Sequence, residues 1–150
     1  MQPLDPQFEN RVRASFARQG AIEEVGARMA RVEAGEVEIE IDFVPRLTQQ
    51  HGFLHGGIVA TILDSACGYA AMTLPGATSE VVAVGYAVSF VAPARGIRVR
   101  AIGRVRRAGR RITFCDGEAL AIGDDGRETL VATMQSTIAT VEARAAESAS

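Results

Sequence analysis

The sequence lacks lysine, has only two cysteines, and contains no apolar run that could span a bilayer without small or polar interruptions. Cys67 and Cys115 lie far apart, and neither has the neighbours typical of a zinc site, so we expect two free thiols and no metal. Unpaired thiols without an evident signal peptide are typical of a reducing compartment. These scarcities predict a soluble protein of the cytoplasm.

The charge of the chain is close to balanced. Its 16 basic residues, all arginine, stand against 18 acidic ones, which gives a net charge of −2 at pH 7. So small a net charge gives no indication of nucleic acid or a membrane surface as a partner. We attribute the exclusive use of arginine mainly to compositional bias, although arginine also suits the recognition of phosphate.

The length of 150 residues, with 47% hydrophobic and 23% charged residues, fits one globular domain. A chain this short can form a core, but association with a second copy would help it. We expect an N-terminal segment with a short helix over residues 1–20 and a main domain over 21–141. Residues 142–150 are small and polar, which predicts a disordered tail.

The pattern of apolar residues predicts strands on both sides of one long helix. Residues 36–43 alternate acidic and apolar side chains, as in a strand with one wet and one packed face. Turn signals between the later strands favour hairpins and hence an antiparallel sheet. The fold class is therefore α+β, with a curved antiparallel sheet of about six strands wrapped around one long central helix. The expected helices cover 6–19 and 58–74, and the expected strands cover 21–34, 36–43, 80–92, 97–106, 112–122 and 127–141.

Residues 51–72 hold both histidines, a Gly-Gly pair and a single carboxylate in an otherwise uncharged run. At about 100° per residue, the helix face around Asp64 carries only small residues. Burying an unpaired charge is costly, so Asp64 needs a function or a partner. We expect the small face to stay open for the same helix of a second, two-fold related copy. The small face comprises Gly57, Ala60, Thr61, Cys67, Gly68 and Ala71, and the large apolar face comprises Ile58, Val59, Ile62 and Tyr69.

Three motifs together resemble a known family. Residues 49–57 read Gln-Gln-His-Gly-Phe-Leu-His-Gly-Gly, Asp64 follows nine positions after His55, and residues 89–94 read Ser-Phe-Val-Ala-Pro-Ala. Together with the arginine-rich hairpin that follows, they closely resemble the hotdog-fold acyl-CoA thioesterases, in particular the phenylacetate-degradation (PaaI-type) branch. The resemblance covers most of the one domain expected. It implies a hotdog-fold thioester hydrolase that cleaves acyl-CoA to free acid and coenzyme A, without metal or other cofactor.

The resemblance also implies a division of roles. The amide N–H of Gly56, with Gly57 beside it at the positive start of the helix, would stabilise an oxyanion. Asp64 lies about 12 Å further along the helix at 1.5 Å per residue, so it would act on the other subunit's substrate, as general base or as nucleophile. Gln49 would position the water or hold the substrate. His55 would order the loop and the region of the thioester sulfur.

The substrate side is less sharply defined. Ala83 stands where some relatives carry a Ser or Thr hydroxyl, which puts the rate or the substrate in doubt. Arg107 and Arg110, near the tip of the hairpin, are candidates for the phosphates of coenzyme A. A mixed aliphatic and aromatic pocket fits aryl-acetyl or medium-chain acyl groups. Its expected lining residues are Phe53, Tyr69 and Phe90.

Simpler interpretations stand beside these. Asp64 could be a structural acid capped by Thr61 or Ser65, Cys67 a small buried residue, and the arginines of 98–106 a solvated sheet face. One rival function is a non-catalytic protein that binds acyl-CoA, which the missing hydroxyl at Ala83 favours. A dehydratase is a second rival, but it needs a histidine and an acid that converge on one proton. The expected assembly is a homodimer or a dimer of dimers.

Overall fold

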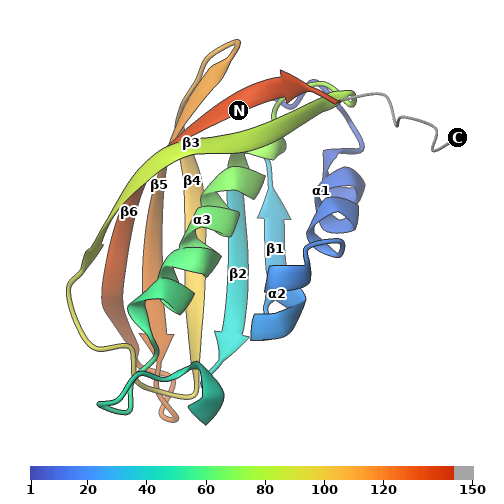
Figure 1. Ribbon diagram of the computed structural model, residues 1–150. Coiled ribbons are helices and arrows are strands. Elements are labelled where there is room, and N and C mark those ends of the chain that lie inside the picture. The colour runs from blue at the N-terminus through green and yellow to red at the C-terminus, as the bar shows by residue number, and fades with distance from the viewer. Residues whose placement is uncertain (144–150) are drawn as a thin grey trace, which may run out of the picture.

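The computed structural model describes residues 1–143, and its strands form one antiparallel sheet that curves around a single long helix (Figure 1). The strand order is β1-β2-β4-β5-β6-β3, so β1 and β3 lie at the two edges. This confirms the predicted α+β class and the central helix. The elements are α1 (Phe8–Phe16), α2 (Gly20–Val25), β1 (Arg28–Glu33), β2 (Glu36–Asp42), the 3-10 helix η1 (Pro45–Leu47), α3 (Gly56–Met72), β3 (Ser79–Phe90), β4 (Arg98–Ala108), β5 (Ile112–Ile122) and β6 (Glu128–Glu142).

The N-terminal segment differs from its prediction. The strand expected over 21–34 is wrong in its first half, because residues 20–25 form the helix α2 and the strand β1 starts only at Arg28. Ile22 is buried by this helical turn, and Gly26 ends it with a φ of 70°, a left-handed conformation that glycine adopts without a steric penalty. Gly20, which follows the first predicted helix directly, begins the helix α2.

Most other boundaries agree with the sequence pattern within two residues. The central helix begins at Gly56, two residues before its predicted start, since His55 caps it. The last strand runs to Glu142, so the first residue of the predicted tail belongs to β6. Residues 144–150, where the rest of that tail was predicted, lie outside the described residues.

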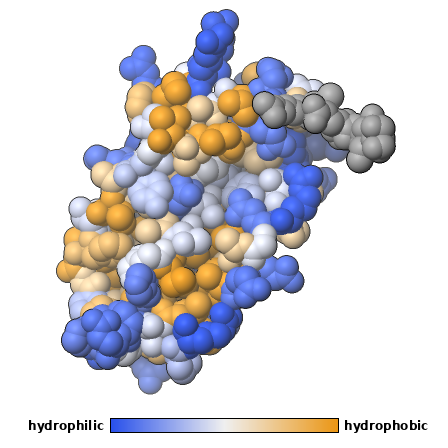
Figure 2. All heavy atoms as spheres, viewed as in Figure 1, coloured by the Kyte–Doolittle hydropathy of each residue, from blue (hydrophilic) through white to orange (hydrophobic). Residues whose placement is uncertain are grey.

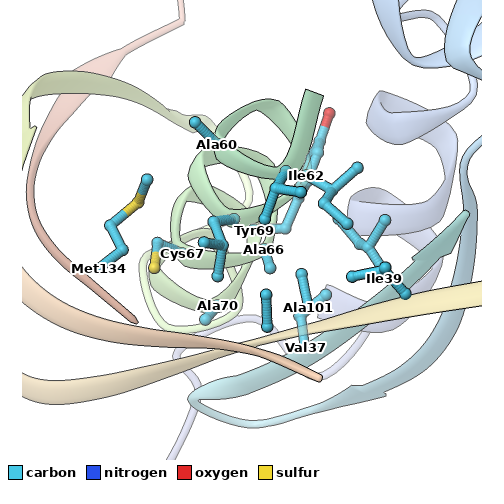
Figure 3. Close-up of a cluster of buried hydrophobic side chains, with 14 of the residues drawn as sticks. Val37, Ile39, Ala60, Ile62, Ala66, Cys67, Tyr69, Ala70, Ala101 and Met134 are labelled. Carbon is cyan, nitrogen blue, oxygen red and sulfur yellow. The ribbon is translucent and has the colours of Figure 1, made fainter. Parts of the chain in front are cut away.

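The face of α3 that rests on the sheet is built from small residues, which corrects the predicted wheel. Ala60, Cys67 and Ala71, expected on the open face, are all buried. A Cβ placed on Gly103 of β4 would lie 2.3 Å from the carbonyl carbon of Ala66, so only glycine lets the strand come this close to the helix. Small side chains therefore serve mainly to bring α3 down onto the sheet (Figure 3).

A narrower stripe of α3 stays open. It follows helical spacing along the side of the helix away from the sheet, and Asp64 lies within it, half-buried. Figure 2 shows a pale stretch over this part of the molecule, between the more hydrophobic surfaces of β3 and of the start of α3. The stripe consists of Gly57, Thr61, Asp64, Ser65 and Gly68.

The two halves of the sheet present different surfaces to solvent. On β4 the predicted arginine stripe pairs with acids of β2: Arg100 lies 3.0 Å from Glu40, and Arg104 lies 2.8 Å from Glu36. The edge strand β3 instead exposes apolar side chains, with Val82 55%, Val84 64% and Phe90 54% exposed. A long apolar edge strand with unpaired backbone groups is a template for pairing with another chain.

Candidate active site

The start of α3 opens into a cavity of about 360 Å³. Gln49, Phe53, His55 and Gly56, four of the residues singled out in the sequence, line this cavity together with Phe90. The loop that precedes α3 is held by hydrogen bonds from the Gln49 N–H to the Phe53 carbonyl oxygen, 3.0 Å, and from the His55 N–H to the Leu47 carbonyl oxygen, 2.9 Å. The chain thus brings these side chains together around one helix terminus.

His55 caps α3. Its Nδ1 accepts a hydrogen bond of 2.9 Å from the N–H of Gly57. In the neutral ring the proton then resides on Nε2, which makes His55 a hydrogen-bond donor toward its surroundings. Because Nδ1 is engaged in the cap, His55 orders the start of the helix and is poorly placed to act as a base through that atom.

Gly56 presents its backbone amide. The N–H of Gly57 is taken by His55, but the N–H of Gly56 donates to no group among residues 1–143. A Cβ on Gly56 would lie 3.0 Å from Cζ of the Phe90 ring, so the ring lies directly against the glycine. An unpaired N–H at the positive end of a helix of 17 residues is well suited to bind developing negative charge.

Gln49 and Phe53 form the outer wall of the same cavity. The side-chain carbonyl oxygen of Gln49 accepts a hydrogen bond from the N–H of His51, which leaves the amide NH₂ as the group available to a ligand. The Phe53 ring stacks with the His51 ring at 6.3 Å between centroids, and the Arg95 guanidinium lies 5.4 Å from the Phe53 centroid.

Asp64 lines a second cavity, of about 330 Å³, which lies along the open stripe and is also lined by Thr61, Ser65 and Gly68. Within the described part of the chain, its buried Oδ1 has no hydrogen-bond partner, and burial raises the pKa of the carboxyl group above its usual range. Ala83 of β3 lines the same cavity. Its methyl group cannot form the hydrogen bond by which a Ser or Thr hydroxyl would orient a water molecule. A carboxylate held in this way is suited to take up a proton.

The two cavities have no lining residue in common. Asp64 follows Gly56 by eight residues, about 12 Å along the helix at 1.5 Å per residue. One chain therefore holds the acid and the free amide too far apart to act on the same carbonyl group.

Arginines of the β4–β5 hairpin line a third cavity, separate from the two described above. Arg107 and Arg110 line a wide groove of about 930 Å³ with Leu74 and Gly76, which follow the C-terminal end of α3. Neither arginine forms an ion pair with any described residue, unlike Arg106, which pairs with Asp116 at 2.5 Å. Their guanidinium groups are thus free for a phosphate.

Sequence reasoning missed several residues around Asp64. The N-terminal helices cover that flank of α3 and contribute Ser15, Gln19 and Ile22 to the cavity wall, and β3 adds Tyr86. Ser15 lies at helical spacing with Phe8, Val12 and Phe16, but nothing in the sequence marks Gln19. Tyr69, expected to line one acyl pocket with Phe53 and Phe90, lies instead in the cavity of Asp64.

Neither cysteine is a candidate nucleophile. Burial raises the pKa of the Cys67 thiol, and it raises that of Cys115 to about 12. The Cys115 thiol donates to the carbonyl oxygen of Cys67 at 3.5 Å, inside the core. A neutral, enclosed thiol is a poor nucleophile. In addition, no described helix is long and apolar enough to cross a membrane.

Comparison with known proteins agrees with this geometry. A family model described as "Thioesterase superfamily" matches residues 51–126, which include all of α3 with Gly56 and Asp64. A thioesterase family protein from Silicibacter pomeroyi, of known crystal structure, is 42% identical, with a TM-score of 0.88 over 90% of this chain and 98% of that one. A protein of Thermoplasma volcanium named as an esterase is 30% identical over 110 residues, 70% of this chain and 82% of its own.

The E. coli PaaI protein from the phenylacetic acid degradation operon shares the fold. It is 17% identical, with a TM-score of 0.79 over 93% of this chain and 97% of that one. The arrangement of α3 inside its curved sheet is thus the hotdog arrangement that the sequence predicted. The chain belongs to the thioesterase superfamily and is a thioester hydrolase.

Proposed function

We propose that the protein hydrolyses acyl-CoA thioesters to the free acid and coenzyme A, at sites that two copies of the chain share. The observation that carries this proposal is the separation of Asp64 from the free N–H of Gly56 on one chain. If a second α3 lies antiparallel along the open stripe, Asp64 of one copy comes opposite Gly56 of the other. A two-fold contact of this kind creates two equivalent sites.

The chemistry needs both groups. The Asp64 carboxylate removes a proton from water, and the water oxygen forms a bond to the thioester carbonyl carbon as the carbonyl electrons move onto oxygen. The N–H of Gly56 from the second copy donates to that oxyanion. When the carbonyl re-forms, the carbon–sulfur bond breaks and the thiolate leaves, taking the proton that Asp64 accepted from water to become the thiol. In the other route, the Asp64 carboxylate attacks the carbonyl directly, the thiolate leaves, and water hydrolyses the resulting anhydride.

Other residues support binding. The Gln49 amide and the Nε2–H of His55 lie beside Gly56 and would hold the water or the thioester. Arg107 and Arg110 would bind the phosphates of coenzyme A. Because the hairpin lies near the C-terminal end of α3, antiparallel pairing brings it toward the Gly56 of the other copy. Aryl-acetyl and medium-chain acyl groups are the proposed substrates.

The exposed edge of the sheet supports the proposal that two copies share each site. Among the described strands, β3 pairs with β6 alone, and its apolar side chains follow the edge beside the open stripe of α3 (Figure 2). Pairing of two β3 edges would cover these side chains and bring the two helices together. A dimer, or a dimer of dimers, is the proposed assembly, and a cytoplasmic location stays a prediction.

The proposal is tested with purified protein, a panel of acyl-CoAs of different chain length and a thiol reagent. Wild type should release thiol, and Asp64→Asn should lower the rate by about a thousandfold, the range of a lost general base. Asp124→Asn, at an exposed turn, is the matched control and should behave as wild type. Near wild-type turnover by Asp64→Asn would refute the role of Asp64. Binding of acyl-CoA without thiol release would favour the non-catalytic alternative.

A further inference from the structure

The cavity next to Asp64 contains a tyrosine whose hydroxyl group is fixed from two sides. Tyr69 is only 4% exposed, and its hydroxyl accepts a hydrogen bond of 2.9 Å from the Gln19 amide and lies 3.3 Å from the Ser15 hydroxyl. The ring is held by an edge-to-face contact with Phe16, at 5.8 Å between centroids. Figure 3 shows the hydroxyl oxygen on the side of α3 away from the sheet. The N-terminal helices thus fix both the ring and its polar end.

The Tyr69 hydroxyl retains the capacity to bind a ligand. Gln19 donates to it through Nε2, and in the contact with Ser15 either hydroxyl can donate. With Ser15 as the donor, the Tyr69 proton points into the cavity and can bind a ligand. Around it the cavity wall is rich in neutral hydrogen-bonding groups, which are Ser15, Gln19, Thr61, Ser65 and Tyr86. A wall of this kind is poorly matched to an acyl group that is apolar throughout.

The charges in the cavity restrict the ligand further. Asp64 and Glu80 line it, and no arginine or histidine does among the described residues. A terminal carboxylate on the acyl group would therefore meet two acids and no cation from this chain's part of the cavity wall. The wall favours a group that is neutral and polar.

Helix geometry separates the two ends of that group. Tyr69 follows Asp64 by five residues, about 7.5 Å along the helix axis and about 140° around it, and both residues line the one cavity. If the thioester carbon lies at Asp64, a polar substituent that contacts Tyr69 must lie several carbons away from it, or across one ring. A cavity of about 330 Å³ has room for such a group.

We propose that Tyr69, held by Ser15 and Gln19, is a specificity-determining residue that binds a neutral hydroxyl group at the far end of the acyl chain. This inference rests on the proposed thioesterase function and adds the acyl class. Tyr69 contacts the distal substituent and takes no part in the attack on the carbonyl carbon. Ser15 and Gln19 are positioning residues that act through Tyr69.

Three CoA thioesters of equal length test the proposal: hexanoyl-CoA, 6-hydroxyhexanoyl-CoA and adipoyl-CoA, whose chains end in methyl, hydroxyl and carboxylate. Wild type should have its highest kcat/KM with the hydroxylated thioester and its lowest with adipoyl-CoA. Tyr69→Phe should lower kcat/KM for 6-hydroxyhexanoyl-CoA by about tenfold, the effect of one lost hydrogen bond. The same variant should lower kcat/KM for hexanoyl-CoA by much less than for the hydroxylated thioester, because the ring and its packing remain.

Gln19→Ala provides a second variant at an exposed position, with Gln135→Ala on the outer face of β6 as its matched control. Gln19→Ala should reduce the preference for the hydroxylated thioester over hexanoyl-CoA, and Gln135→Ala should not change it. Equal losses on both thioesters in Tyr69→Phe would show a merely structural tyrosine and overturn the inference. Wild-type preference for hexanoyl-CoA would also overturn it while leaving the thioesterase function intact. Absence of hydrolysis with every acyl-CoA would refute the proposed function itself.

Discussion

Gly56 and Asp64 lie eight residues apart on α3, and they line cavities that share no wall residue. The amide of Gly56 is unpaired, and so is the buried Oδ1 of Asp64, within the described residues. Both unpaired groups are thus fixed within one chain, but at a distance from each other. In the proposed dimer, a second copy supplies the group that each site lacks.

The role of the Gly56 amide can be tested by a pair of substitutions. Gly56 is the first residue of α3, where proline is tolerated, and His55 has the extended conformation that proline requires of its predecessor. Gly56→Pro removes the N–H and should lower kcat by about a hundredfold or more, as in the loss of an oxyanion donor. Gly56→Ala adds a comparable Cβ beside Phe90 but keeps the N–H, so it should retain most of the activity. Equal losses in both variants would indicate crowding by Phe90 instead.

The pH dependence should reflect Asp64. Because burial raises the pKa of this carboxyl group above the ordinary 3.8, kcat/KM should fall on the acid side at a higher pH than for an exposed aspartate. The raised pKa also means that the folded protein holds this proton more tightly than the unfolded chain does, so stability is lost as pH rises through the raised pKa.

Asp64→Asn removes the loss of stability that comes from ionising a buried carboxyl group. Its melting temperature should exceed that of wild type at pH 7, and the difference should shrink as the pH falls through the raised pKa to well below 3.8, where the wild-type carboxyl group is protonated in both states. Thermal unfolding across this pH range measures both curves. A variant less stable than wild type at neutral pH would contradict the raised pKa.

The hairpin arginines should matter only when the substrate carries phosphates. The double substitution Arg107→Gln with Arg110→Gln should raise KM for an acyl-CoA by about tenfold, since each lost guanidinium removes a charged hydrogen bond. The N-acetylcysteamine thioester of the same acid lacks the phosphates, and its KM should not change. Arg127→Gln, at an exposed turn, is the control. An equal rise in KM for both thioesters would argue against phosphate binding.

The close approach of α3 to the sheet can be tested at Gly103. Gly103→Ala would place a Cβ 2.3 Å from the Ala66 carbonyl and 2.5 Å from the Cys67 nitrogen, both rigid backbone groups. Overpacking of this kind should lower the free energy of unfolding by about 3 kcal/mol. Gly20→Ala, where a Cβ meets nothing within 4 Å, should have little effect. Urea unfolding of both variants measures the difference.

Local patterns predicted most of the fold. The alternation in residues 36–43 and the turn signals between the later strands determine pairing that is local along the chain, as in β4 with β5 and β5 with β6. The segment before β1 was missed because Ile22 is buried by one helical turn, which leaves no alternation to recognise. A helical wheel centred on Asp64 places Ala60 and Cys67 on the open face, but both are buried, and Gly103 and Gly117 of the sheet leave room for Cys67 in the core.

Several residues of the candidate site could be predicted from the sequence, but not which of them line the same cavity. The run 49–57 is contiguous, so Gln49, Phe53, His55 and Gly56 converge through the loop itself. Tyr69 depends on Ser15 and Gln19, about 50 positions earlier in the chain. Contacts between segments so far apart depend on tertiary packing, and the local spacing of apolar residues does not predict them.

The shared site is tested most directly by mixing two inactive variants. Gly56→Pro and Asp64→Asn subunits are co-expressed with different tags, and the mixed dimers are assayed for thiol release beside each variant alone. In a mixed dimer one site combines the intact Gly56 of one subunit with the intact Asp64 of the other, and the second site has neither. Random pairing should therefore restore about a quarter of wild-type activity, because half of the dimers carry one working site of two. If the mixture stays as inactive as the separate variants, each chain must supply both groups to its own site, and the account is wrong.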